Sequence, residues 1–136
     1  MNISSMLYGG GSPALRQLSI FMIVLGVSFV VVLPFAPEVM PPLFRWFNPA
    51  VNIADEHMIL SMYIALGICF IVAAKDPLGN AIIIDFTIIS SVLHGLVMLY
   101  YSFALEGEHL HLAGDVPLLF VLAAGLAYFH PKRLAR

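Results

Sequence analysis

The sequence predicts an all-α integral membrane protein, an up-down bundle of four transmembrane helices that forms one domain over residues 1–136. Of the 136 residues, 61% are hydrophobic and 10% are charged, whereas a soluble domain carries about 25% charged residues. Apolar runs long enough to cross a bilayer recur along the chain. The connections after the second and third runs are short, which favours antiparallel neighbours.

The first predicted span covers residues 18–35, which contain no charged side chain. Pro13 suits the first turn of its helix, while Pro34 and Pro37 lie at its exit. No small-residue cleavage site follows the apolar run. We therefore expect an uncleaved membrane helix rather than a signal peptide.

Residues 36–56 form a connection rich in proline and aromatic side chains. At its centre, Arg45 and Trp46 lie within the segment Leu43–Phe47. Aromatic rings around one cation suit the headgroup region of a membrane. The alternative is a hydrophobic plug packed over the end of the bundle, and the sequence leaves both open.

The remaining predicted spans cover residues 58–74, 81–104 and 116–130. The second ends at Lys75 and Pro77, where charge and proline terminate the helix. Asp115 is predicted to cap the fourth helix, with Pro117 in its first turn.

The basic residues predict the orientation of the four spans. With both termini in the cytoplasm, all of them except Arg45 lie on the cytoplasmic side: Arg16, Lys75, Lys132, Arg133 and Arg136. This agrees with the positive-inside rule. We expect a multi-pass protein of the bacterial inner (cell) membrane.

Helices in lipid associate through small residues and polar contacts. Each predicted span offers one such pair: Gly26 and Ser28, Ser61 and Ala65, Ser91 and Gly95, Ala123 and Ala127. We expect these pairs to lie at helix–helix contacts.

The third span carries an unusual polar stripe. At 100° per residue, one helical face holds Thr87, Ser90, Ser91, His94, Met98 and Tyr101. If this face meets the second helix, His94 and Met98 surround one buried pocket together with Met62 and Cys69.

Two interpretations of His94 remain open. It either fixes helix packing through a hydrogen bond, or it is the centre of a ligand site. That site would consist of His94, Ser91, Met98, Tyr101, Met62 and Cys69. Its neutral imidazole would bind a quinone carbonyl, or copper as Cu(I) with the sulfur ligands. Haem is disfavoured because a bis-histidine site needs a second membrane histidine.

Asp85 lies on the opposite side of the same helix, near its cytoplasmic end. We interpret it as an anchor that forms an ion pair or contacts water, with a proton-entry group as the alternative.

The outer loops gather further carboxylates and imidazoles. A zinc or copper site there would use His57, Glu108, His109 and His111. The alternative is a solvated acidic face, and no established metal-site spacing decides between the two.

Three short segments carry a family resemblance: Met58–Tyr63, Ser90–His94 and Gly114–Pro117. In this order they resemble a family of small uncharacterised four-span bacterial membrane proteins, distantly similar to the DoxX-like proteins. The resemblance covers roughly residues 56–131. It implies a four-helix membrane fold without an established activity, and it favours a quinone-linked role slightly.

We expect a non-enzymatic membrane protein, an accessory or stabilising subunit of a larger membrane complex or a homo-oligomer in the lipid bilayer. No catalytic spacing occurs, and the formal net charge of −2 argues against nucleic-acid binding. The alternatives are a redox-associated subunit that binds quinone or metal near His94, and an outer-face metal-binding protein.

Overall fold

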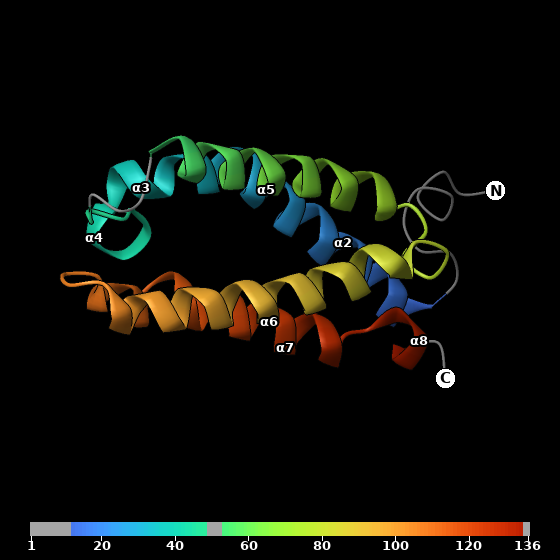
Figure 1. The fold of residues 1–136 in the computed structure, drawn as a ribbon. Helices are drawn as coiled ribbons and strands as arrows, with labels where there is room; N and C mark the ends of the chain where they lie inside the picture. The colour runs from blue at the N-terminus through green and yellow to red at the C-terminus, as the bar shows by residue number, and fades with distance from the viewer. Residues whose placement is uncertain (1–11, 49–52, 135–136) are drawn as a thin grey trace.

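The computed structural model describes residues 12–48 and 53–134, which are helical and contain no β-strand (Figure 1). Four helical runs in these residues are long and apolar enough to cross a membrane: Pro13–Val39, Ile53–Ala73, Ala81–Ala104 and His109–Leu134. The predicted all-α bundle is therefore confirmed. We call the end that holds Ser12 and Leu134 the terminal end.

The first run is a composite of four segments. They are α2 (Pro13–Val27), a π-helical turn (Ser28–Val32), a 3₁₀ turn (Leu33–Phe35) and α3 (Ala36–Val39). The span was predicted to end at residue 35, with Pro34 and Pro37 at its exit, yet the helical path continues to Val39. Pro34 has no N–H for the carbonyl of Val30. The backbone therefore forms a wider π-helical turn before Pro34 and a tighter 3₁₀ turn that includes it. In the wider turn, Leu33 N–H donates to Ser28 O, five residues earlier.

A short helix, α4 (Pro41–Phe44), follows α3, and we call residues 36–48 the cap. The chain continues with α5 (Ile53–Ala73), α6 (Ala81–Ala104), a 3₁₀ turn (His109–Ala113), α7 (Asp115–Tyr128) and α8 (Pro131–Leu134). The helix α5 thus begins before the predicted residue 58.

The prediction that Asp115 caps the fourth helix is wrong. Gly114 occupies the cap position, and Asp115 is the first helical residue. Its carboxylate instead accepts a hydrogen bond from the buried imidazole of His111, at 2.9 Å. A charge-assisted bond to a buried ring therefore replaces the expected bond to the helix backbone.

The helices pack as two close pairs, α2 on α5 and α6 on α7. In the first pair the backbones touch at Gly26 and Gly67: a Cβ on Gly26 would lie 2.6 Å from Gly67 O. In the second pair Gly95 lies under the ring of Phe120. Glycine permits these approaches because it has no side chain.

The expected small-residue contacts are therefore only partly correct. Gly26, Ser91, Gly95 and Ala123 are buried, whereas Ser61, Ala65 and Ala127 are exposed. The helix α5 is rotated so that Gly67 and Phe70, rather than Ser61 and Ala65, face the bundle.

The main core lies towards the terminal end, where all four long helices meet. Its most buried side chains come from each of them: Met22 from α2, Phe70 from α5, Ile84 from α6 and Leu126 from α7. Towards the cap, α5 and α6 separate (Figure 1). A smaller cluster there joins Met98 to Val116 and Leu119 of α7. The tight core thus occupies one half of the bundle and leaves the cap half less completely filled.

We predict that Gly67→Ala destabilises the bundle by about 1–3 kcal/mol, because the new Cβ would lie 2.7 Å from the backbone oxygen of Gly26. The measurement is SDS-induced unfolding from mixed micelles. Gly125→Ala is the matched control, since its Cβ would meet nothing within 4 Å. The control should be neutral or stabilising by up to about 1 kcal/mol. Equal stabilities of the two variants would contradict the close crossing.

Candidate ligand-binding cavity

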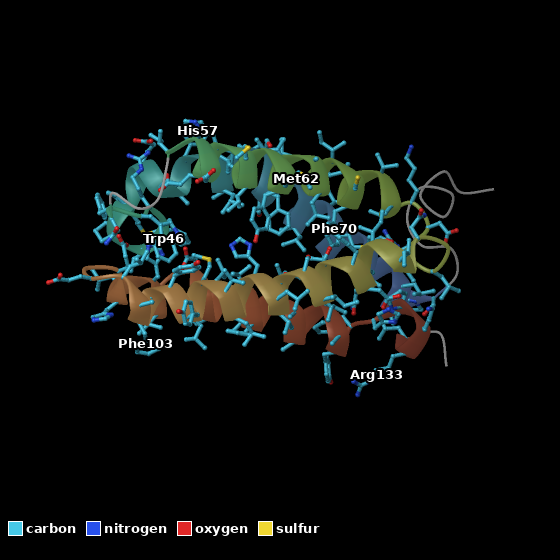
Figure 2. The ribbon with its side chains drawn as sticks, in the orientation of Figure 1. Trp46, His57, Met62, Phe70, Phe103 and Arg133 are labelled. Atoms are coloured by element: carbon cyan, nitrogen blue, oxygen red, sulfur yellow. The ribbon has the colours of Figure 1, made fainter. Side chains whose placement is uncertain are left out.

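A cavity of about 450 Å³ lies in the cap half, between the α2–α5 pair and the α6–α7 pair. Its walls are mostly apolar and include Leu25, Phe29, Leu60, Met98 and Leu122. The cap closes its outer end with Phe44, Arg45 and Trp46. Figure 2 shows Trp46 near the cap end of this space and Phe70 deeper, towards the terminal end.

Two polar side chains meet across the cavity. Tyr63 from α5 and His94 from α6 form a hydrogen bond of 3.1 Å between the phenol oxygen and Nδ1. Phe29 packs edge-on against Tyr63, with ring centroids 5.4 Å apart. When the hydroxyl of Tyr63 donates to Nδ1, the ring proton of His94 lies on Nε2. Among the described residues Nε2 has no hydrogen-bond partner, so it is a donor available to a ligand.

The structure brings together only some of the residues predicted for this site. His94 and Met98 line the cavity. Ser91 is buried one turn from Gly95, on the face that packs on α7. Tyr101, Met62 and Cys69 are exposed on the outer surface.

The predicted pocket formed by His94 with Met62 and Cys69 is therefore not present. The polar stripe of α6 packs mainly on α7 rather than on α5. Met62, 66% exposed, and Cys69 lie on the lipid side of α5.

The sequence analysis did not include Tyr63 or Trp46 among the candidate site residues. Tyr63 had a usable signal, because a phenol near the middle of an apolar span needs a hydrogen-bond partner, as His94 does. Trp46 had no such signal in the sequence, since its position over the cavity depends on contacts with residues far away in the chain.

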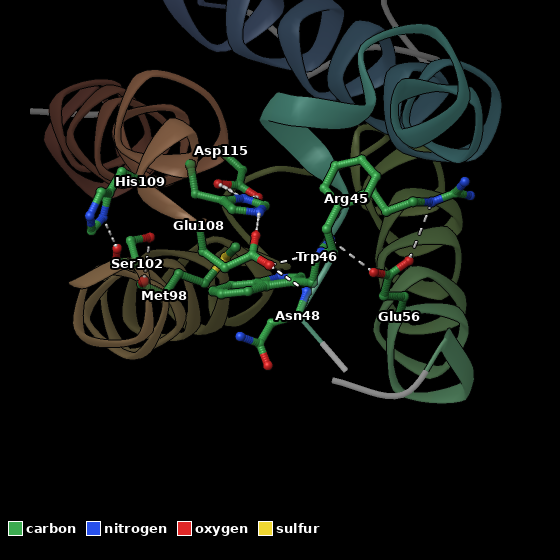
Figure 3. Close-up of polar contacts among 11 residues, drawn as sticks. Arg45, Trp46, Asn48, Glu56, Met98, Ser102, Glu108, His109 and Asp115 are labelled. Carbon is green, nitrogen blue, oxygen red and sulfur yellow. Dashed lines mark hydrogen bonds and ion pairs between the residues drawn. The ribbon is translucent and has the colours of Figure 1, made fainter. Parts of the chain in front are cut away.

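A buried carboxylate holds the cap in place. Glu108 is 2% exposed, and its Oε1 accepts the backbone N–H groups of Phe47 at 2.8 Å and Asn48 at 2.6 Å (Figure 3). Its other oxygen lies 3.3 Å from Nε2 of His111, whose Nδ1 contacts Asp115. Trp46 stacks on the same imidazole, with ring centroids 4.3 Å apart. A carboxylate thus lies beside each nitrogen of this ring, with a hydrogen bond to Nδ1 and an approach of 3.3 Å to Nε2.

A second carboxylate holds the cap from the opposite side. Glu56 of α5 accepts the backbone N–H of Trp46 at 3.0 Å. It also lies 3.8 Å from Nε of Arg45 (Figure 3). Arg45 pairs with Glu38 as well. Leu43 packs directly on Gly114, where a Cβ would meet the backbone oxygen of Leu43. The cap therefore packs over the bundle end as a plug, the second of the two arrangements expected for it.

The four residues predicted for an outer metal site do not converge. His57 is exposed on α5, and Nδ1 of His109 is 2.6 Å from the carbonyl of Ser102, to which it donates (Figure 3). His111 has Glu108 and Asp115 on opposite ring nitrogens, so one ion cannot contact all three groups. In residues 12–48 and 53–134, no three His, Cys, Asp or Glu side chains are arranged to hold a metal.

At the terminal end Asp85 has a hydrogen bond with Nε2 of His130 at 2.9 Å and an ion pair with Nζ of Lys132 at 3.8 Å. His130 is a second histidine within the candidate membrane spans, although haem was disfavoured for want of one. It pairs with Asp85, whereas His94 pairs with Tyr63 in the cap half, so the two histidines belong to different clusters.

We predict that Glu108→Gln loosens the cap by about 1–2 kcal/mol, because charge-assisted hydrogen bonds are about twice as strong as neutral ones. Trp46 is the chain's one tryptophan, so quenching of its fluorescence by acrylamide measures the loosening directly. The control is Glu106→Gln, which removes an exposed carboxylate from the same loop. Unchanged Trp46 accessibility in the Glu108 variant would show that this carboxylate does not hold the cap.

The comparisons with known proteins give one match, to a family model over residues 12–131. No curated protein and no solved structure matches the chain. The match agrees with the resemblance to an uncharacterised family, while it does not support a DoxX-like relationship or a bacterial origin. Because the match spans most of the chain, the protein belongs to the family of unknown function DUF6632.

Proposed function

We propose that the protein binds a lipophilic small molecule of the quinone class in the cavity between its two helix pairs. The observation that carries this proposal is His94, which lines a mostly apolar cavity and whose Nε2 has no partner among the described residues. Nε2 is a hydrogen-bond donor when the hydroxyl of Tyr63 donates to Nδ1. A neutral imidazole at membrane depth suits a carbonyl oxygen.

The size and polarity of the cavity support this ligand class. Its volume of about 450 Å³ lies within the ordinary range of small-molecule sites, about 300–1,000 Å³. The apolar walls match a ring and the start of an isoprenoid chain, and Tyr63 fixes the orientation of the His94 ring. In this proposal the protein binds or presents the ligand and performs no reaction.

We predict that a short-chain 1,4-naphthoquinone quenches Trp46 fluorescence with saturable binding. His94→Leu should weaken binding about tenfold, because it removes the donor to the carbonyl. Tyr63→Phe should weaken it about threefold through loss of ring orientation. The measurement is a fluorescence titration in nanodiscs.

Tyr101→Phe is the matched control, since Tyr101 is exposed on the outer side of α6 and its variant should bind like the unaltered protein. Non-saturable quenching, or equal affinity of the His94 and Tyr101 variants, would contradict the proposed site.

A role as an accessory subunit or a homo-oligomer is a second proposal. Ser61, Ala65 and Cys69 are four residues apart and all exposed on α5. Small residues at this spacing permit another helix to approach closely. This face supports contact with a further membrane helix in the bilayer.

We predict that Ala65→Leu weakens such an assembly, whereas Ala124→Leu, on the exposed side of α7, does not. The measurement is the mass of the particle extracted in mild detergent. A particle of one chain in every variant would exclude the assembly.

For orientation, we propose that the terminal end faces the cytoplasm of a bacterial cell and the cap faces outward. The support is the exposed Arg16, Lys75, Lys132 and Arg133 at the terminal end, as the positive-inside rule requires.

A further inference from the structure

We infer that the cap end of the cavity is a charge filter, which admits ligands with uncharged head groups and rejects anionic amphiphiles such as fatty acids. The inference rests on the proposed binding function and names the residues that set its selectivity. A cavity within a membrane is surrounded by lipids, so apolar walls alone do not distinguish a quinone from a fatty acid.

The charges that line the cavity are strongly unequal. Four carboxylates contribute to its described lining: Glu38, Asp55, Glu56 and Asp115. The lining has one guanidinium, that of Arg45, together with the imidazoles of His57 and His94. Behind the wall, Glu108 lies 3.3 Å from the His111 imidazole. Even when that ring is protonated, the carboxylates outnumber the fixed positive charges and a net negative charge remains.

The guanidinium of Arg45 is not available to an anionic head group. It already pairs with Glu38 and lies 3.8 Å from Glu56. A ligand carboxylate near Arg45 would therefore meet two protein carboxylates at the same time. Like charges repel, and the repulsion is stronger from Glu56, whose side chain is 17% exposed, than from Glu38, whose side chain is 63% exposed and better screened by water.

The negative charge also reaches the position proposed for the head group. Asp115 lines the same cavity as Tyr63 and His94. The Tyr63–His94 pair offers hydrogen bonds but no fixed positive charge with which to hold an anion. A neutral carbonyl obtains the hydrogen bond without the repulsion.

Two nearly isosteric probes test the filter: 2-methoxy- and 2-hydroxy-1,4-naphthoquinone with the same 3-alkyl chain. The hydroxy compound is an anion at neutral pH, whereas the methoxy compound is neutral. Quenching of Trp46 in nanodiscs of uncharged lipid reports both affinities. We expect the anion to bind at least tenfold more weakly at low salt, and the difference to shrink at high salt.

Asp55→Asn should reduce the difference about threefold, because Asp55 is an exposed carboxylate of the cavity lining whose change does not disturb the cap contacts. Glu106→Gln removes an exposed carboxylate outside the lining and should leave the difference unchanged.

The outcomes separate this inference from the proposed function. If the methoxy compound binds through His94 and the anion binds equally well, the filter alone is refuted. If neither quinone binds, or if His94→Leu has no effect, the proposed function and the filter both fail.

Discussion

The backbone contact between Gly26 and Gly67 determines the arrangement on which the rest of the structure depends. It holds α2 against α5 so closely that these helices form a unit of their own, and α6 and α7 form the other unit around Gly95. The two units share a tight core only at the terminal end. Towards the cap they separate, and the space between them contains the Tyr63–His94 pair. The cavity is therefore a consequence of where the small residues lie.

The fold class and the importance of His94 could be predicted, because both depend on local properties. Composition indicates a membrane protein, and helical periodicity collects the polar residues of α6 on one face. The partner of that face could not be predicted. In lipid, buried and lipid-facing side chains are equally apolar, so Met62 and Cys69 were as plausible inside as Gly67 and Phe70. The structure places the first two outside.

The acidic residues of the outer loops illustrate a different limit of sequence reasoning. Glu108 lies in a polar loop and suggested a solvated or metal-binding face, yet its side chain is almost fully buried. Its partners, the backbone N–H groups of Phe47 and Asn48, are 61 and 60 residues away in the chain. Backbone donors have no sequence signature, so no pattern of residue types could reveal that this carboxylate holds the cap over the cavity.

The π-helical turn Ser28–Val32 constrains the number of residues in the first span. Such a turn is equivalent to one residue inserted into an α-helix, and one residue rotates a helix by about 100°. Gly26, at the α5 contact, precedes this turn, and Leu33, on the cavity wall, follows it, so the two residues lie on opposite sides of a change in helical phase. Among relatives, a one-residue deletion here would leave hydrophobicity unchanged while it redirected either the wall or the contact. The exact residue count of this span is therefore a constraint in its own right.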